Sequence, residues 1–174
     1  VYLQVWDWPL NRAPLAVSLA ADDTPTPKAG EWKHDGRGWW YRYEDGSYPA
    51  DTAVMIDGTT YRFDASGYMR TGWAFEGGQW FYHASSGAQV SGWVYSGVHW
   101  YYMSPATGAM ATGWVQVGST WYYLSPATGA MHSGWLQEGG HWYYLDRSSG
   151  AMVTGWVKIY WKWYHFADNG QLID

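Results

Sequence analysis

Aromatic and glycine residues recur along this chain with a period of about 21 residues, unlike the 3.6-residue spacing of an amphipathic helix. Each repeat begins with a Gly-Trp pair, and a second tryptophan eight residues after the glycine opens an aromatic run such as Trp-Tyr-Tyr. A short turn that ends in glycine completes the unit. The pairs begin at Gly72, Gly92, Gly113, Gly134 and Gly155, and the second tryptophans are Trp80, Trp100, Trp121, Trp142 and Trp163. This pattern predicts a tandem array of one small unit.

Each unit is too short for two helices and has the pattern of a β-hairpin, with a glycine turn between two aromatic strands. In one unit, Trp114 precedes the turn at Gly118, and Trp121 follows it. Because side chains alternate between the two faces of a strand, Trp121 and Tyr123 share one face and Tyr122 takes the other. A single hairpin is not stable in water, but stacked hairpins stabilise their neighbours. The pattern therefore predicts an all-β solenoid of stacked β-hairpins.

The register continues upstream in a weaker form. Trp32 and Trp40 lie eight residues apart, and Val54 stands in the first tryptophan position of the following unit. We therefore expect about seven hairpin repeats over residues 30–174, preceded by an N-terminal segment and linker at residues 1–29.

The N-terminal segment lies outside the repeat pattern. Residues 13–21 are apolar and small, as in a secretion leader, but no basic segment precedes them. An ordinary N-terminal segment is therefore preferred over a leader remnant. Residues 21–28 are polar and contain proline, which is typical of a linker.

The composition excludes several classes of function. The chain has 16 Trp, 16 Tyr and 22 Gly but no Cys, which excludes disulfides and thiolate metal sites. The formal net charge of −5 weighs against nucleic-acid binding, which needs clustered Lys and Arg. No apolar run reaches the ~20 residues of a membrane span. So many aromatic side chains must either build a core or line binding sites.

No catalytic or metal-binding motif is recognisable in the sequence. His99 and His141 occupy the same position two repeats apart, and there is no HExxH or Cys/His cluster. Carboxylates such as Asp57 and Asp64 fall in expected turns, where they usually serve turn geometry. Nucleophile-elbow, P-loop and dinucleotide-binding signatures are missing. We expect a chain that is not an enzyme and that uses no cofactor or metal.

The repeats resemble a known family. The run TGWVQVGSTWYYLSPATGAMHSGW, at residues 112–135, resembles the choline-binding or cell-wall-binding repeats of Gram-positive surface proteins and phage lysins. Residues 36–73 resemble the first repeats of the same modules, and glucan-binding repeats and clostridial toxin tails are also similar. The resemblance implies a left-handed superhelix with ligand sites between consecutive hairpins. Each site would take two aromatic residues from one repeat and one from the next, often with a Met beside them.

Applied repeat by repeat, this arrangement identifies three cages of three aromatic rings. They consist of Trp93, Trp100 and Tyr123 with Met110, of Trp114, Trp121 and Tyr144 with Met131, and of Trp73, Trp80 and Tyr102, where Gln89 replaces the Met. The middle tyrosines of the aromatic runs are expected to pack within the stack instead, at Tyr101, Tyr122 and Tyr143.

Both ends of the array carry weaker candidates. A cation would be repelled by a protonated histidine, and an aliphatic wall lacks the quadrupole of an aromatic ring. The candidates are Trp135 and Trp142 closed by His165, then Trp32 and Trp40 closed by Phe63, and, as a poor site, Val54, Tyr61 and Tyr82.

Such cages suit choline or phosphocholine on a cell-wall polymer. A trimethylammonium group is charged, weakly hydrated and without an N–H to donate, so ring faces can replace its water. Each ring contributes roughly 0.5–2 kcal/mol, so one site would bind with a Kd on the order of 1 mM. Several sites on one polymer raise the avidity by ~10²–10⁴. We therefore expect a secreted module that binds choline groups of (lipo)teichoic acid at the bacterial cell surface.

Two other functions fit the same aromatic repeats. Trp and Tyr can stack on sugars in a glycan-binding module, or join hairpins in an assembly repeat without a small ligand. The last repeat also departs from the others, because Tyr160 replaces the glycine that Gly118 provides in its counterpart. We expect this hairpin to close the stack, with a homodimer contact as the alternative.

Overall fold

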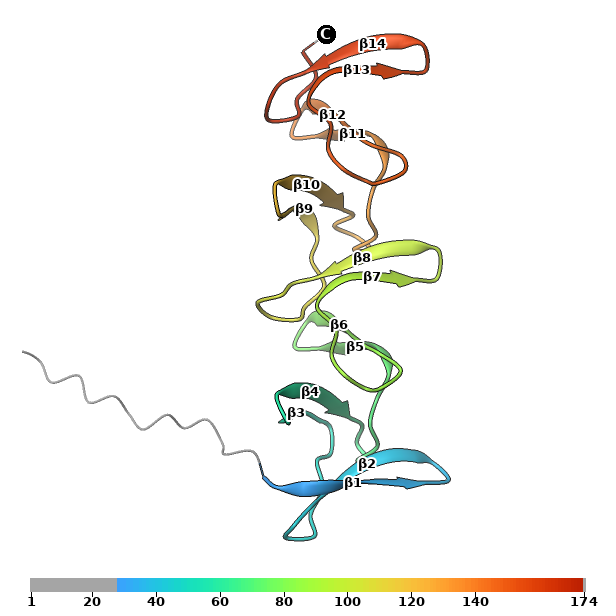
Figure 1. Ribbon diagram of the computed structural model, residues 1–174, viewed down its shortest axis with the longest axis vertical. Helices are drawn as coiled ribbons and strands as arrows, with labels where there is room; N and C mark the ends of the chain where they lie inside the picture. The colour runs from blue at the N-terminus through green and yellow to red at the C-terminus, as the bar shows by residue number, and fades with distance from the viewer. Residues whose placement is uncertain (1–27, 174) are drawn as a thin grey trace, which may run out of the picture.

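The computed structural model describes residues 28–173 and shows, within that range, fourteen β-strands and no helix, hence none able to cross a membrane (Figure 1). The expected leader and most of the expected linker lie outside the described residues. The strands pair in chain order as seven two-stranded antiparallel sheets, numbered here as hairpins 1 to 7. The hairpins are β1 (Gly30–Asp35) with β2 (Gly38–Tyr43), β3 (Thr52–Ile56) with β4 (Thr59–Phe63), β5 (Gly72–Glu76) with β6 (Gln79–His83), β7 (Gly92–Ser96) with β8 (His99–Met103), β9 (Gly113–Val117) with β10 (Thr120–Leu124), β11 (Gly134–Glu138) with β12 (His141–Leu145), and β13 (Gly155–Ile159) with β14 (Lys162–Phe166). The expected all-β stack of hairpins is confirmed.

Positive φ angles at the hairpin turns explain several glycines of the repeat. In hairpin 3, Gly77 and Gly78 have φ values of 55° and 79°, the left-handed conformation that suits a two-residue hairpin turn. In hairpin 7 the same two positions are held by Tyr160 and Trp161, with φ values of 46° and 72°. A bulky side chain in this conformation is strained by about 1–3 kcal/mol. The last hairpin therefore carries two aromatic residues at its tip against the local backbone preference.

Cross-strand pairing gives each hairpin two different faces. In hairpin 5, Trp114 lies opposite Tyr123, and their rings meet edge to face with centroids 5.2 Å apart. Tyr122 lies between Trp121 and Tyr123 in β10 and so takes the opposite face. One face of the hairpin therefore carries both tryptophans, and the other carries the middle tyrosine.

Hydrogen bonds from the connecting loops join each hairpin to the one before it. The loop after hairpin 4 donates the Met110 N–H to the carbonyl oxygen of Trp80 in hairpin 3, at 2.7 Å. The loop after hairpin 5 repeats this contact between Met131 and Trp100, also at 2.7 Å. In hairpins 3 and 4, the face that carries the two tryptophans meets the face of the next hairpin that carries the middle tyrosine. Trp73 contacts Tyr101 and Trp93 contacts Tyr122 in this way.

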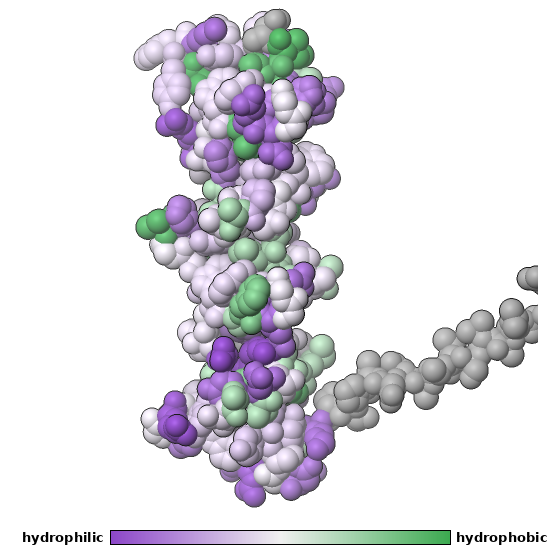
Figure 2. Space-filling view, turned by 180° about the vertical axis from the view of Figure 1, so that it is seen from behind, coloured by the Kyte–Doolittle hydropathy of each residue, from purple (hydrophilic) through white to green (hydrophobic). Residues whose placement is uncertain are grey.

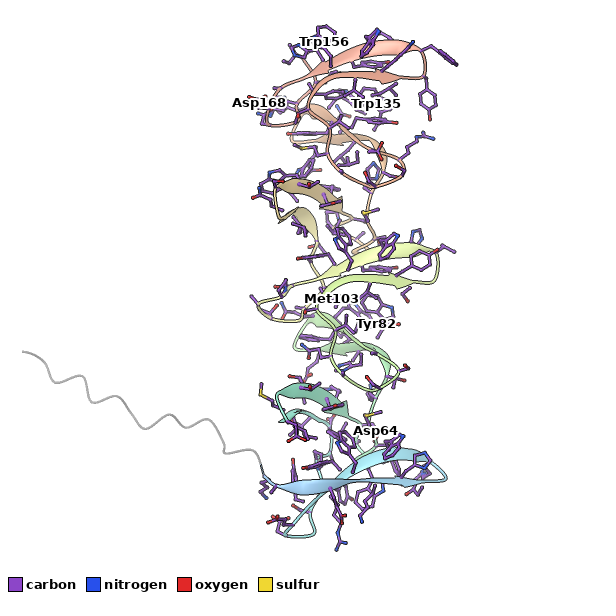
Figure 3. All side chains as sticks on the ribbon, viewed as in Figure 1. Asp64, Tyr82, Met103, Trp135, Trp156 and Asp168 are labelled. Carbon is purple, nitrogen blue, oxygen red and sulfur yellow. The ribbon has the colours of Figure 1, made fainter. Side chains whose placement is uncertain are left out.

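The core is a narrow column along the stack rather than a wide layer. It is built mainly from the last residue of the second strand in hairpins 2 to 7, which is buried each time, and Figure 3 shows Met103 inside the stack. His83 is the polar member of the column, and its Nδ1 lies 3.1 Å from the carbonyl oxygen of Gly87. Burial lowers the pKa of His83. The members of the column are Phe63, His83, Met103, Leu124, Leu145 and Phe166.

Successive hairpins rotate about the long axis of the molecule. Figure 1 shows that the orientation of hairpin 1 recurs at hairpin 4 and again at hairpin 7. Because of this rotation, the turn after hairpin 6, with Ser148 and Ser149, reaches the tryptophan face of hairpin 4. Figure 2 shows that strongly hydrophobic residues form only scattered patches on the face turned to the viewer.

Candidate functional site

A cavity lined by three aromatic rings and a methionine lies between hairpins 3 and 4. Hairpin 3 contributes Trp73 and Trp80, whose ring centroids are 6.2 Å apart with the planes at 87°. Hairpin 4 contributes Tyr101, 4.8 Å from Trp73, and the loop after it contributes Met110. The Trp73 ring therefore stands at a steep angle to both Trp80 and Tyr101, at 87° and 73°, beside an open space.

The same arrangement recurs between hairpins 4 and 5. Trp93 and Trp100 are 6.4 Å apart at 88°, and Tyr122 lies 4.8 Å from Trp93. Met131 and the two serines of the turn after hairpin 6 complete the lining. The cage geometry thus reproduces within a few tenths of an ångström from one interface to the next.

The third copy lies between hairpins 5 and 6. Trp114 and Trp121 line it, with Tyr143 at 4.9 Å from Trp114. Met152 and Asn169 complete the lining. The structure therefore brings together all six tryptophans that the sequence assigned to the three best cages, in the expected pairs.

The third aromatic ring of each cage comes from a different tyrosine than the sequence predicted. The expected residues, Tyr102, Tyr123 and Tyr144, are buried and pack on the first tryptophan of their own hairpin. The ring that closes each cage comes from the middle tyrosine instead. A site between two hairpins needs the tryptophan face of one and the opposite face of the next, and strand alternation gives that face to the middle tyrosine.

The methionine of each cage is shifted by one repeat from the prediction. Met110 was expected beside Trp93 and Met131 beside Trp114, but they line the cages one hairpin earlier. The reason is the loop hydrogen bond that ties each methionine to the second tryptophan of the preceding hairpin. Met152, which was not selected from the sequence, consequently belongs to the third cage, and Gln89 belongs to none of the three.

The interface between hairpins 6 and 7 also differs from the prediction. Trp135 and Trp142 are 6.1 Å apart at 86°, and Figure 3 shows Trp135 between these two hairpins. The closing ring is Tyr164, 4.9 Å from Trp135, and not His165. His165 instead stacks on Trp156 within hairpin 7, at 4.5 Å and nearly parallel. The expected repulsion between a protonated His165 and a bound cation therefore does not apply to this cage.

In place of methionine, this fourth Trp-Trp-Tyr set has a leucine. The Leu172 N–H donates to the carbonyl oxygen of Trp142 at 2.8 Å, the same contact that the methionines make elsewhere. The set keeps its three rings and exchanges a thioether for a branched aliphatic side chain.

The N-terminal cage has a different second tryptophan from the predicted one. Trp32, Trp39 and Tyr61 line the cavity between hairpins 1 and 2, together with Met69. Two predicted residues serve elsewhere, because Trp40 packs on Tyr48 and Phe63 is part of the buried column. The two tryptophans of a cage are seven residues apart, as in Trp73 and Trp80, and this spacing selects Trp39.

The interface between hairpins 2 and 3 has lost the cage. By strand register, Ala53 and Thr60 of hairpin 2 occupy the positions that the two cage tryptophans, Trp73 and Trp80, occupy in hairpin 3. An ion pair between Arg62 of hairpin 2 and Glu76 of hairpin 3 crosses this interface instead. The poor site predicted here is corrected as well, since Tyr61 lines the preceding cavity and Val54 packs in the core beside it.

The cavities have no charged lining. The residues around the cages of hairpins 1, 3, 4 and 5 are aromatic, aliphatic, thioether, hydroxyl and amide groups. Within residues 28–173, no group of three or more His, Asp or Glu residues is placed to hold a metal ion. Electron-rich ring faces without a neighbouring charge attract a cation that cannot donate hydrogen bonds.

The stacked hairpins and their cages define a repeat-type binding module. The choline-binding repeat model matches residues 71–112 and 111–154, and the cell wall binding repeat model matches residues 54–69 and 154–172. The chain belongs to this family of choline-binding and cell-wall-binding repeat proteins. Comparison with curated protein sequences gives no match.

Several solved structures from Streptococcus pneumoniae are similar to the chain. CbpJ of strain TIGR4 is 38% identical with a TM-score of 0.77, over 83% of this chain and 52% of its own. Choline binding protein F is 37% identical with a TM-score of 0.73, over 83% of this chain and 51% of its own. A further crystal structure of this protein is a complex with ipratropium obtained by soaking. The autolysin LytC is 30% identical with a TM-score of 0.68, over 83% and 33%. The chain thus spans about half the length of the first two relatives and about a third of LytC.

Proposed function

We propose that this chain is a non-catalytic cell-wall-binding module that captures choline or phosphocholine groups of (lipo)teichoic acid. The observation that carries the proposal is the recurrence of one uncharged Trp-Trp-Tyr cage at the three successive interfaces from hairpin 3 to hairpin 6. Its rings lie 4.8 to 6.4 Å from one another wherever the structure gives these contacts. Such a cage stabilises a trimethylammonium group through three ring faces.

The relatives support the nature of the ligand. A crystal structure of choline binding protein F was obtained in complex with ipratropium by soaking, and the charged centre of ipratropium is a quaternary ammonium. The same protein has been studied in the presence of a peptidoglycan analogue. A quaternary ammonium carried on a wall polymer is the ligand that joins these two observations with the cages of this chain.

The number of cages compensates for the weakness of each one. A single three-ring cage is expected to bind choline with a Kd on the order of 1 mM. A polymer with many choline groups can occupy several cages at once, so the avidity rises by ~10²–10⁴ over one site. We place the module at the bacterial cell surface as a secreted protein, and any catalytic activity would come from another part of a longer protein.

Retention on a choline-affinity resin tests the proposal. The unmodified chain should bind the resin and elute with millimolar choline. Trp100→Ala should reduce retention with a small change in melting temperature, because Trp100 is exposed and lines a cavity. Trp40→Ala is the matched control, since Trp40 lies outside the cages and should leave retention unchanged.

Two results would overturn the choline function. Failure of the unmodified chain to bind the resin would exclude it directly. Unfolding by Trp100→Ala, combined with no effect of choline on the melting temperature of the unmodified chain, would favour the assembly repeat without a small ligand.

We also propose that hairpin 7 forms a homodimer contact rather than a closed cap. Its turn residues Tyr160 and Trp161 are exposed, and Trp161 is 90% exposed. An exposed aromatic cluster of this kind favours association with another surface. Light scattering should give a dimer mass for the unmodified chain and a monomer mass for Trp161→Ser, and a monomer at all concentrations would contradict the contact.

A further inference from the structure

The fourth Trp-Trp-Tyr set, formed by Trp135, Trp142 and Tyr164, has a charged neighbour. The ammonium group of Lys162 lies over the ring of Tyr164, with Nζ 5.0 Å from the ring centroid. Tyr164 is the ring that closes this set, 4.9 Å from Trp135. A positive charge of the protein itself is therefore in contact with a ring that a bound cation would use.

Strand alternation places Lys162 on the side of hairpin 7 that faces hairpin 6. Lys162 and Tyr164 are two residues apart in β14 and share one face, whereas Trp163 and His165 take the other. His165 stacks on Trp156 on that other face. The position of Lys162 in the strand therefore directs it towards the fourth set and not towards Trp156.

No opposite charge neutralises Lys162 in the part of the chain that the structure describes. Lys28 and Lys33 pair with carboxylates at 2.8 and 2.7 Å, but no ion pair within residues 28–173 includes Lys162. The Lys162 side chain is exposed. Its full charge therefore acts on a ligand in the neighbouring set.

The cages of the preceding hairpins have no lysine at this position. By strand register, His99, Thr120 and His141 occupy in hairpins 4, 5 and 6 the place of Lys162 in hairpin 7. Among the cation–π contacts of residues 28–173, only that of Lys162 involves the ring of a Trp-Trp-Tyr set. Thr120 is the neutral counterpart, beside the Tyr122 ring that closes the cage of hairpin 4.

Coulomb's law gives the sign and the size of the effect of Lys162 on a ligand. A trimethylammonium group held by the set lies within about 6 Å of the Tyr164 ring centroid. Its nitrogen and the Lys162 Nζ are then at most about 11 Å apart. At such a separation, repulsion between two like charges near a protein surface weakens binding by about threefold, and an anionic group on the ligand is attracted to a similar extent.

We propose that Lys162 determines the charge preference of the set between hairpins 6 and 7. It disfavours a ligand that carries only a positive charge, and it favours a ligand in which an anionic group lies next to the trimethylammonium group. This inference rests on the proposed choline function. It makes one position of the array differ from the uncharged cages in the net charge of the ligand that it prefers.

Titration of the tryptophan indole N–H resonances of the full chain with choline and with phosphocholine tests this role. Lys162→Gln removes the charge and keeps a side chain of similar length. At Trp142, the variant should bind choline about threefold more tightly and phosphocholine about threefold more weakly, so the ratio of the two dissociation constants changes by about tenfold. A local loss of structure would instead move both dissociation constants in the same direction. In about 1 M salt, the difference between the variant and the unmodified chain should disappear.

Three further variants control for the substitution. Lys162→Arg keeps the charge and should keep the ratio of the two dissociation constants. Lys158→Gln is the matched control, because it removes a lysine from the face of hairpin 7 that carries Trp156, and it should leave both constants at Trp142 unchanged. Thr120→Lys introduces the charge beside the cage of hairpin 4 and should weaken choline binding at Trp100 by about threefold.

The outcomes distinguish the charge preference from the choline function. Equal changes for the two ligands in Lys162→Gln, no change for either, or no response of Trp142 while other cages bind choline, would overturn the charge preference and leave the choline function intact. A lack of response from every cage tryptophan of the unmodified chain would overturn the choline function, and the charge preference with it.

Discussion

Tyr122 and Tyr123 are adjacent in one strand but have different environments. Tyr122 presents its ring to Trp93 in the cage of hairpin 4. Tyr123 is 5% exposed, and its hydroxyl donates to the Glu138 carboxylate at 3.0 Å. Burial, and then this hydrogen bond, raises the pKa of the Tyr123 phenol. The two positions therefore separate ligand contact from packing within a single repeat.

Leucine substitutions at these two tyrosines test the separation. Tyr122→Leu removes one wall of a cage, so choline binding at that site should weaken by about 0.5–2 kcal/mol with little change in stability. Tyr123→Leu keeps the cage but leaves a space in the core, so the free energy of unfolding should fall by about 2–3 kcal/mol. Choline titration and urea unfolding measure the two effects. Equal loss of stability in both variants would contradict the assignment.

His83 introduces a titratable group into the buried column. Burial holds its pKa below the value of about 6.5 expected in the unfolded chain. As the pH falls below that value, the unfolded chain takes up the proton first, so the free energy of unfolding decreases. This contribution to stability is therefore fully present above about pH 6.5 and is lost under more acidic conditions.

Replacement of His83 by the residue of the next repeat should remove this pH dependence. His83→Met introduces the side chain that Met103 provides at the same position of the column. Urea unfolding at about pH 7 and about pH 5, on either side of the ordinary histidine pKa, should show a smaller loss of stability in the variant than in the unmodified chain. Gln89→Met, outside the column, is a control that should keep the original pH dependence. Identical pH profiles of His83→Met and the unmodified chain would contradict the role of burial.

At the scale of the hairpin, period-two alternation predicts more of the site than the resemblance alone. Tyr122 and Tyr123 are neighbours in β10 and must take opposite faces, so the ring that closes the cage can be predicted from the sequence. The seven-residue spacing of the cage tryptophans likewise selects Trp39 over Trp40. The position of each methionine could not be predicted in this way, because it depends on a loop hydrogen bond to the preceding hairpin.

The turn of hairpin 7 offers a test of strain at the same scale. Replacing Tyr160 and Trp161 by Asn and Gly provides the residues that this turn prefers, so the free energy of unfolding should rise by about 1 kcal/mol. The gain is limited because Arg147 and Lys158 lie over these two rings and lose their contacts. Chemical denaturation measures the change.

A matched turn controls for the exchange. Asp57→Asn alters the turn of hairpin 2, where Asp57 and Gly58 have φ values of 49° and 76°. Asp-Gly and Asn-Gly both suit this turn, so the free energy of unfolding should hardly change. A loss of stability in the hairpin 7 variant would show that contacts of the two aromatic rings outweigh the backbone strain.

At the scale of the whole molecule, the repeat period predicts the stack of hairpins but not how distant repeats meet. The turn with Ser148 and Ser149 lines a cage two hairpins earlier, and this neighbourhood follows from the rotation of the superhelix. The cavity of hairpin 3 is lined in the same way, since residues 126–128 come from the turn after hairpin 5. Such contacts depend on the angle between hairpins, which no local pattern specifies.

The multivalent array also predicts how binding depends on the number of cages. Removing one cage by Trp121→Ala should lower the affinity for free choline only at that site, but it should weaken retention on a polymer that bears many choline groups more strongly. Surface plasmon resonance on choline-bearing polymer, compared with a choline titration in solution, measures both. Equal effects in the two experiments would argue against multivalent capture.

The central claim is that the cages recognise the positive charge of a trimethylammonium group. The most direct measurement is a titration of the tryptophan indole N–H resonances with choline and with 3,3-dimethylbutan-1-ol, its neutral isostere. The cage tryptophans should shift at millimolar choline, Trp40 should not, and the neutral isostere should bind at least about tenfold more weakly. Equal binding of the two compounds, or no shift of the cage resonances, would contradict the account.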